Sequence, residues 1–188
     1  MKKIMFNDKY GLTQAVLDGR KTMTRRIIHA ENIPDDPEYG YAPNIDACCV
    51  FNEDDVVAKS QYNLGDVVAI AQCYYNVYGH ETCISERGEK DSGIFNKMFV
   101  RAESMPHHIK ITSVRVERLQ DISDEDCLRE GIYLLQEELG KPSTYTFSDD
   151  YLYMNPRSAF KALIDKVSGK GTWDSNPMVW VYEFELVD

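Results

Sequence analysis

The hydrophobic and polar residues of this 188-residue chain change their period several times, which predicts separate short strands and helices without an internal repeat. Residues 178–186 show the clearest alternation, with Trp180, Tyr182, Phe184 and Leu186 on one face of a predicted strand. The opposite face of this strand changes from apolar to acidic toward its end. We expect Trp180 to pack in the core.

Residues 109–119 predict a second long strand, but their alternation contains a fault. Apolar side chains occupy odd positions in the first half of this segment and even positions in the second half. One extra residue near positions 112–113 would restore the phase, so we expect a β-bulge there. Bulges of this kind help a sheet to curve.

Shorter runs rich in β-forming residues predict further strands. These runs are residues 3–6, 22–28, 64–71 with an extension through Tyr74, Tyr75 and Tyr78, and 96–102.

Helical spacing of apolar residues and signals for helix ends predict three helices. The first ends before Gly19. The second begins at Ser123 in a sequence that resembles a capping box, and it stops at Gly131. The third opens at Asn155-Pro156, where proline suits the first helical turn.

Two segments resemble insertions into this framework. Residues 30–63 contain three prolines, eight acidic residues and one basic residue, which predicts a long loop with little regular structure. Residues 79–94 predict a hairpin tip, and residues 140–154 are also loop-like. Strands interrupted by a few helices predict one α+β domain over residues 1–188, with a small curled sheet or barrel flanked by helices.

The charge of the chain is uneven, which restricts the ligands that it can bind. The net charge is −10, yet residues 1–30 hold seven bases and two acids. Binding a long stretch of nucleic acid without sequence preference requires a broad basic face. The sequence therefore disfavours such binding and allows recognition of one nucleotide-sized anion.

Other features of the composition favour a cytoplasmic protein. Five cysteines, two of them adjacent at Cys48 and Cys49, predict reduced thiols and no disulfide framework. No apolar run approaches the roughly 20 residues that span a bilayer, and the N-terminal apolar segment breaks off too soon for a signal peptide. His80 and Cys83 lack a second ligand pair, so no metal site is expected. The sequence has no glycine-rich phosphate loop of the Walker or Rossmann type, so no other cofactor is expected.

The densest group of reactive side chains lies in residues 19–26, with the sequence Gly-Arg-Lys-Thr-Met-Thr-Arg-Arg. Neighbouring cations disfavour one another's charge, so a partly buried lysine here would have a lowered pKa and could act as a base. A threonine hydroxyl needs such a base to become a nucleophile. Composition alone favours the simpler interpretation, a basic strand edge exposed to water.

Residues 17–26 also resemble the signature of ASCH domains, which belong to the PUA-like superfamily. Three further segments resemble that family in the same order along the chain. They are residues 65–68, residues 114–119 followed by Ile122, Glu130 and Gly131, and residues 180–184. The arrangement is most similar to the larger, phage- and prophage-type members.

The resemblance implies a small PUA-like β-barrel with helices around it and a cleft for RNA or a nucleotide beside the basic signature. One small bacterial branch of the family consists of amidohydrolases that remove the acetyl group from N4-acetylcytidine. Matched to that branch, Lys21 would be the proton acceptor, Thr24 the nucleophile and Glu130 the proton donor. Such a set suits amide hydrolysis, because the hydroxyl needs activation and the leaving amine needs a proton.

Three hypotheses remain open from the sequence. The first is a hydrolase acting on an acylated nucleobase. The second is a non-catalytic module that binds a nucleoside, a nucleotide or a short RNA through Arg20, Lys21, Arg25 and Arg26. The third is a protein–protein adaptor with an acidic surface. We prefer the first, because pure RNA binding does not need the acid in the second helix.

The hydrolase hypothesis makes one geometric demand. Lys21 and Thr24 differ in parity, so in a straight strand their side chains would point to opposite faces. The two side chains can share a pocket only if Lys21 still lies in the turn after Gly19.

Overall fold

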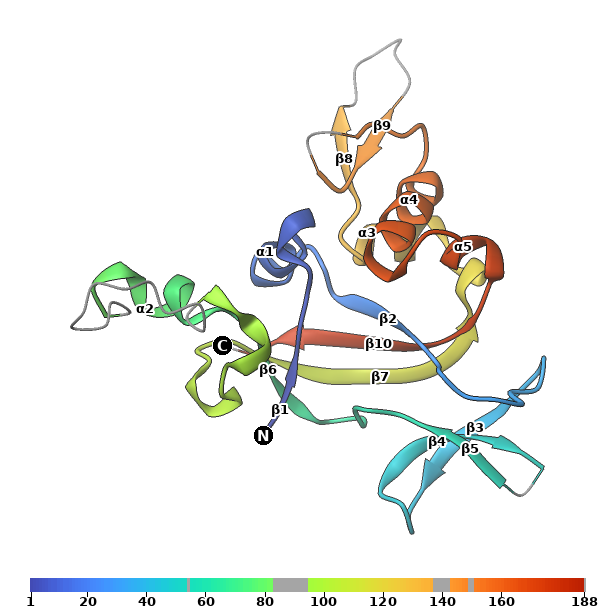
Figure 1. The fold of residues 1–188 in the computed structure, drawn as a ribbon. Coiled ribbons are helices and arrows are strands. Elements are labelled where there is room, and N and C mark those ends of the chain that lie inside the picture. The colour runs from blue at the N-terminus through green and yellow to red at the C-terminus, as the bar shows by residue number, and fades with distance from the viewer. Residues whose placement is uncertain (54, 83–94, 137–142, 149–150, 188) are drawn as a thin grey trace.

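A computed structural model of the chain describes residues 1–53, 55–82, 95–136, 143–148 and 151–187. Its largest sheet has five strands (Figure 1). In spatial order these are β1 (Lys2–Ile4), β6 (Val67–Ile70), β7 (His108–Arg118), β10 (Met178–Leu186) and β2 (Met23–Ile27). The β1–β6 pair is parallel and the other three pairs are antiparallel. Mixed strands and helices confirm the predicted α+β class.

The two long strands, β7 and β10, lie at the centre of the sheet. Their register shifts between Glu183 and Phe184, which face Ser113 and Ile111 respectively. Thr112 is therefore the extra residue, and the predicted bulge is confirmed.

The sheet is open among the described residues. Strands β1 and β2 are its two edges, and they do not pair with each other. The small closed barrel expected from the family resemblance is therefore not formed by the described hydrogen bonds. The sheet is curved by its bulge and covered by helices, but it keeps both edges.

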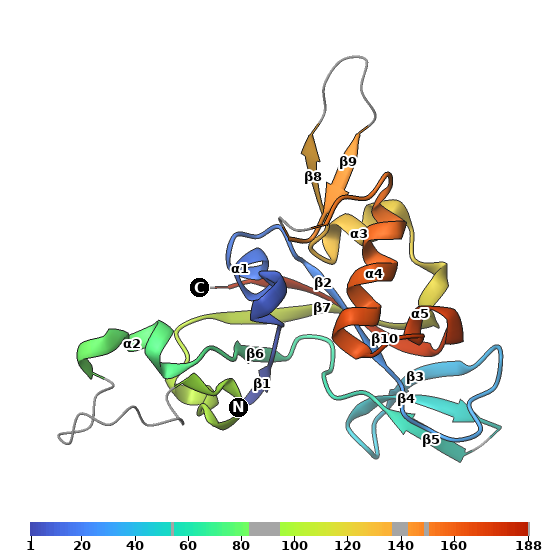
Figure 2. The same cartoon turned by 45° about the horizontal axis from the view of Figure 1, so that its top comes forward.

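Five α-helices accompany the described strands. They are α1 (Leu12–Leu17), α2 (Tyr74–Thr82), α3 (Asp124–Arg129), α4 (Pro156–Ser168) and α5 (Thr172–Ser175). Helices α3 and α5 both lie against α4 (Figures 1 and 2). Short 3₁₀ helices span Asp8–Tyr10, Lys97–Phe99, Ala102–Ser104 and Leu119–Asp121. Each described helix is too short or too polar to cross a membrane.

The predicted helix starts at Ser123 and Asn155 are confirmed. The Ser123 hydroxyl accepts a hydrogen bond from the Asp126 backbone N–H at 3.0 Å. The Asn155 side chain accepts a hydrogen bond from the Ser158 backbone N–H at 2.8 Å. Each cap satisfies a backbone donor that the first turn of a helix leaves without a partner.

The prediction of an unstructured loop over residues 30–63 is wrong. A separate three-stranded antiparallel sheet occupies most of it, formed by β3 (Glu38–Ala42), β4 (Ala47–Asn52) and β5 (Asp55–Lys59). The central strand, β4, buries an apolar run of four residues at its start. Two acidic residues, Asp46 and Glu53, adopt positive φ on either side of β4. The acids that suggested a loop thus lie partly in turns between real strands.

Two predicted strands form helices instead. Residues 74–82 form α2, with a kink at Gly79, and do not extend β6. Residues 97–99 and 102–104 form 3₁₀ helices where a short strand was predicted. Most of the predicted hairpin tip, residues 83–94 with Cys83, lies outside the described residues.

The loop predicted over residues 140–154 is also partly wrong, because β9 (Thr144–Thr146) pairs with β8 (Tyr133–Gln136).

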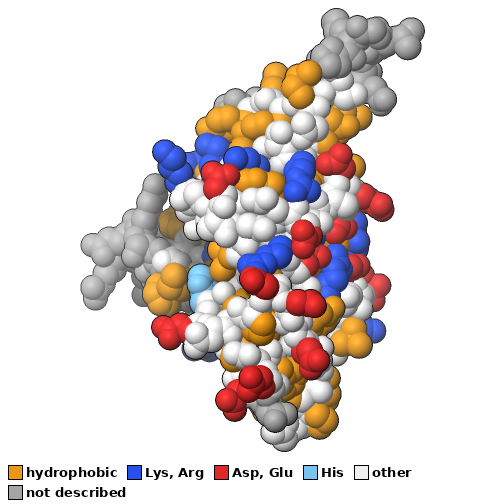
Figure 3. Space-filling view, turned by 90° about the vertical axis from the view of Figure 1, so that its right-hand side faces the viewer, with side chains coloured by type: hydrophobic (Ala, Val, Ile, Leu, Met, Phe, Trp, Pro, Cys, Tyr) orange, Lys and Arg blue, Asp and Glu red, His pale blue; other side chains and the backbone are white. Residues whose placement is uncertain are grey.

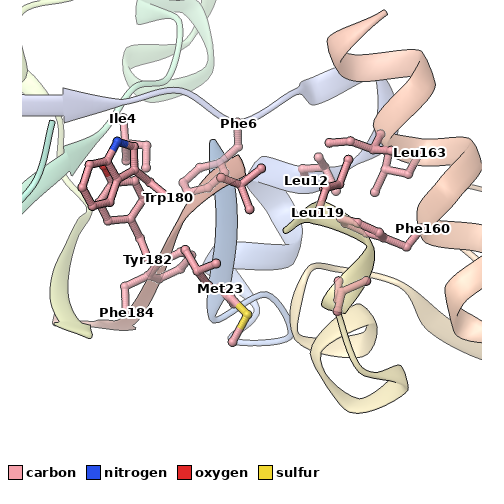
Figure 4. Packing of buried hydrophobic residues seen from close by; sticks show 14 of the residues in the cluster. Ile4, Phe6, Leu12, Met23, Leu119, Phe160, Leu163, Trp180, Tyr182 and Phe184 are labelled. Carbon is pink, nitrogen blue, oxygen red and sulfur yellow. The ribbon is translucent and has the colours of Figure 1, made fainter. Parts of the chain in front are cut away.

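The main core joins the five-stranded sheet to α1 and α4. Figure 4 shows Trp180 and Tyr182 of β10 on one side of Phe6, with Leu12 and Leu163 on the other. All five side chains are buried. Phe6 follows β1, so the core places the N-terminal segment between the sheet and α4.

Candidate active site

A cavity of about 570 Å³ opens between β2, the segment after β1, and α4. Its volume lies within the range of small-molecule sites, roughly 300–1,000 Å³. The lining is apolar on the α4 side and polar on the β2 side. The residues used below that line it are Lys3, Phe6, Leu12, Lys21, Thr24, Arg25, Arg26, Gln61, Tyr62, Glu130, Leu163 and Ile164.

Lys21 lies in the turn that precedes β2, as the hydrolase hypothesis requires. Gly19 adopts a positive φ of 73°, and the Lys21 backbone N–H donates to the Ala15 carbonyl at 2.8 Å. Strand β2 begins two residues after Lys21, at Met23. The strand alternation therefore does not apply to Lys21, and its side chain can share a cavity with that of Thr24.

The Lys21 side chain is buried against Glu130, which is 109 residues away in sequence. Its ammonium donates to the Glu130 carboxylate oxygen Oε2 at 2.6 Å and to the Glu130 backbone carbonyl at 2.7 Å. Only 2% of Lys21 and 4% of Glu130 is exposed. An amine and a carboxyl group thus meet directly at the wall of the cavity.

Local structure explains the position of Glu130. This residue is the C-cap that directly follows α3, and Gly131 comes next with a φ of 104°. A Cβ atom on Gly131 would lie 3.2 Å from Leu12 Cδ2 and 3.6 Å from Lys21 Cδ. Glycine is thus required both for the turn and for the close approach of α3 to α1.

The environment of Lys21 lowers its pKa. Burial is the largest cause, because it disfavours the charged amine. The Glu130 carboxylate acts in the opposite direction, whereas the nearby Arg26 and Arg25 lower the pKa further. The direction agrees with the expectation from clustered cations, although burial contributes more.

Thr24 is buried in β2, opposite Tyr182 of β10, and lines the same cavity as Lys21 and Glu130. The fold thus brings a hydroxyl to a cavity that also holds the amine and the carboxyl group.

Arg26 also lines the cavity, and Arg20 does not. One Arg26 nitrogen donates to the Met5 carbonyl at 2.7 Å, and the guanidinium lies 5.9 Å from the centre of the Phe6 ring. Arg20 is exposed, pairs with Asp18 at 3.1 Å and lines a different cavity. Of these two arginines, Arg26 lines the cavity beside Lys21 and Arg20 does not.

Arg25 belongs to a network of ion pairs behind the cavity. Its side chain is 1% exposed and contacts three carboxylates, those of Glu117, Asp126 and Glu130. Burial opposes its charged form, but these carboxylates outweigh burial and raise the pKa of Arg25. Figure 3 shows that acidic and basic side chains also lie close together over the middle of one face of the molecule.

Sequence reasoning missed several lining residues. The sequence places Phe6 only in a predicted strand, and it gives no signal for Leu163 and Ile164 beyond the helix that opens at Asn155, yet these three residues form the apolar wall of the cavity. Gln61 and Tyr62 were placed in a loop. No local signal separates an apolar residue that lines a cavity from one that packs in a core, so only the tertiary arrangement reveals these positions.

Comparison with known proteins gives little guidance. No family model matches the chain, and no curated protein matches it. A similarity to a solved structure is found. That structure is protein EF3133 from Enterococcus faecalis V583, described as DUF984, with 16% sequence identity over 94% of this chain and 67% of the other. The TM-score of 0.37 is too low to support an argument about fold or function.

Proposed function

We propose that this chain is an amidohydrolase that removes an acyl group from a modified nucleobase such as N4-acetylcytidine. The main support is the 2.6 Å contact between Lys21 and Glu130 at a cavity that Thr24 also lines. Amide hydrolysis needs a nucleophile, a group that accepts its proton and a group that protonates the leaving nitrogen. The resemblance of residues 17–26 to ASCH domains supports the same assignment.

The first chemical step transfers the acyl group to Thr24. Lys21 can transfer one proton to Glu130 along their hydrogen bond, which leaves a neutral amine and a neutral carboxyl group. The Lys21 amine then takes the proton of the Thr24 hydroxyl, whose oxygen forms a bond to the acyl carbon. The carbon–nitrogen bond breaks, and Glu130 gives its proton to the leaving nitrogen.

The second step restores the enzyme. After the deacylated nucleoside leaves, a water molecule attacks the Thr24 ester, and the bond between the acyl carbon and the threonine oxygen breaks. The Lys21–Glu130 pair takes one proton from this water and returns one to Thr24. The products are the deacylated nucleoside and a carboxylic acid, and all protons are accounted for.

Burial makes the proton exchange within this pair easier. A lysine in water holds its proton too strongly to act as a base near neutral pH. Burial lowers the pKa of Lys21, which brings its neutral form closer in free energy to the ammonium. The lowered pKa therefore suits the proposed role as a proton acceptor.

The cavity has features that suit an acylated base. Its apolar wall of Phe6, Leu163 and Ile164 can contact the flat base or the acyl group. Arg26, Gln61 and Tyr62 supply polar groups to the same lining.

A non-catalytic nucleotide-binding module is the second candidate, and the charges of the cavity favour it. Among the described lining residues, Lys3 and Arg26 are cations that lie outside both the Lys21–Glu130 pair and the network of ion pairs around Arg25. On a chain with a net charge of −10 these two cations would suit an anion such as a nucleotide phosphate.

The test of the hydrolase is release of cytidine from N4-acetylcytidine, followed by liquid chromatography. Thr24→Val keeps the shape of the side chain and removes the nucleophile, so turnover should fall by at least about 10³-fold. Thr112→Val, at the exposed bulge residue, is the matched control and should retain activity. Intact-protein mass spectrometry should detect one added acetyl group on the wild-type chain and none on the Thr24 variant.

The opposite outcome would favour the binding module. If the wild-type chain releases no cytidine but binds cytidine monophosphate, and Arg26→Ala abolishes that binding, the hydrolase proposal is wrong.

A further inference from the structure

All the N–H donors of the Arg25 guanidinium are taken up by contacts with other side chains of the protein. It carries five N–H donors, and the structure records five contacts. Nε donates to Glu117 Oε1 at 2.9 Å. Nη1 contacts Glu130 Oε1 and Met23 Sδ, both at 3.1 Å, and Nη2 contacts Glu117 Oε1 at 2.5 Å and Asp126 Oδ2 at 3.0 Å. No donor remains for a ligand, so the role expected for Arg25 in ligand binding does not fit its surroundings.

We infer that Arg25 is a positioning residue, which holds the Glu130 carboxylate in the orientation that the proposed hydrolysis needs. This inference rests on the proposed function. Arg25 binds Glu130 Oε1, and Lys21 binds Glu130 Oε2. The two cations therefore fix both oxygens of one carboxylate, and each oxygen has a different neighbour.

This division of the two oxygens has a chemical consequence. Arginine keeps its proton under all ordinary conditions, so Oε1 faces a permanent cation that cannot exchange a proton with it. Oε2 faces Lys21, which can. The exchangeable proton is thus directed to Oε2, on the side of Glu130 where Lys21 lines the cavity.

The anchors of Arg25 come from two further elements of the fold. Glu117 belongs to β7 and Asp126 to α3, so Arg25 ties β2 to both. Arg115 contacts the same two anchors, at 3.2 Å and 3.1 Å. No contact of Arg115 with Glu130 is recorded among the described residues, and Arg115 therefore offers a matched control within the same network.

The experiment compares two substrates that differ in their leaving group. Hydrolysis of N4-acetylcytidine needs protonation of the leaving nitrogen, whereas an aryl acetate with a stable phenolate leaving group does not. Arg25→Lys keeps the charge but loses the planar fork. We expect kcat for the amide to fall by about 10–100-fold with KM unchanged, and kcat for the ester to change much less. Arg115→Lys should leave the amide-to-ester ratio at the wild-type value.

A second comparison protects the test against unfolding. If Arg25→Lys fails to fold, Glu117→Gln weakens the anchor of Arg25 and should show the same selective loss on the amide. Where Arg25→Lys folds, its combination with Glu130→Gln should be no slower than Glu130→Gln alone, since both changes act through one carboxylate.

The possible failures can be told apart. A wild-type chain that does not hydrolyse the amide contradicts the proposed function, and the positioning role with it. An active wild-type chain whose Arg25 variant loses amide and ester activity equally, or whose Arg115 variant shows the same selective loss, contradicts only the positioning role.

Discussion

Replacement of Lys21 with methionine should destabilise the protein strongly, whatever its catalytic role. Methionine keeps most of the length of the lysine side chain and removes its charge. The substitution breaks two hydrogen bonds, those to the Glu130 carboxylate at 2.6 Å and to the Glu130 backbone carbonyl at 2.7 Å. Both acceptors would stay buried, because only 4% of Glu130 is exposed.

The size of the effect follows from this burial. Removing one partner of a buried ion pair costs about 3–5 kcal/mol, because the remaining charge is left without compensation. Arg25 still faces the carboxylate, which reduces the loss. The carbonyl that loses its donor adds about 1–3 kcal/mol. These opposing corrections leave the expected loss of unfolding free energy at about 3–5 kcal/mol.

Urea unfolding followed by circular dichroism measures this loss, with Lys2→Met as the matched control. Lys2 pairs with Asp66 at 2.7 Å, almost the same distance, but the two side chains are 47% and 29% exposed. Exposed pairs contribute about 0–1 kcal/mol, so the control should lose little. The two ion pairs have nearly the same contact distance, so the comparison tests burial together with the second hydrogen bond that Lys21 makes to the Glu130 carbonyl.

A double-mutant cycle completes the test. Combining Lys21→Met with Glu130→Gln should cost less than the sum of the two single changes, with a coupling of about 0.5–3 kcal/mol. The reasoning is refuted if Lys21→Met costs no more than Lys2→Met, or if the two changes at the buried pair are additive.

Three further predictions concern the framework around the cavity. Ser123→Ala should lower the unfolding free energy by about 1 kcal/mol in urea titrations, because α3 loses its N-terminal cap. Gly131→Ala should cost about 1–3 kcal/mol in the same titrations, because φ is 104° and the new Cβ meets a leucine at 3.2 Å, whereas Gly40→Ala, with open space around it, should cost little. Burial raises the pKa of Glu183, but hydrogen bonds from Arg129 and Arg115 outweigh the effect of burial and hold this pKa below its ordinary value. The unfolding free energy of the wild-type chain should thus fall as the pH drops from the ordinary carboxyl pKa through the lowered pKa of folded Glu183. Glu183→Gln should have a smaller unfolding free energy at neutral pH and should lack this part of the acid dependence.

Local signals in the sequence determined the parts of the fold that depend on neighbouring residues. The alternation of residues 178–186 corresponds to β10, and the change of phase in residues 109–119 predicted the bulge near positions 112–113, which the strand register places at Thr112. Side-chain caps at Ser123 and Asn155 started α3 and α4. Each of these features is encoded within a few residues, so it can be recognised without knowledge of the rest of the chain.

Features that depend on distant partners could not be recognised in this way. The acidic and proline-rich composition of residues 30–63 concealed a three-stranded sheet, whose strands are stabilised by pairing with one another and by burial of β4. The tyrosines of residues 74–78 suit a strand locally but form a helix in the tertiary structure.

The sequence predicted some features of the candidate site, and the tertiary structure was needed for the others. The sequence by itself identified the residue types, since the basic signature and its family resemblance pointed to Lys21, Thr24 and Glu130. Only the tertiary structure decided that Lys21 and Glu130 meet, and that Arg25 faces carboxylates instead of a ligand. The reason is physical: a buried charge is stable only beside its partner, and here the partner lies more than 100 residues away, beyond the reach of any local pattern.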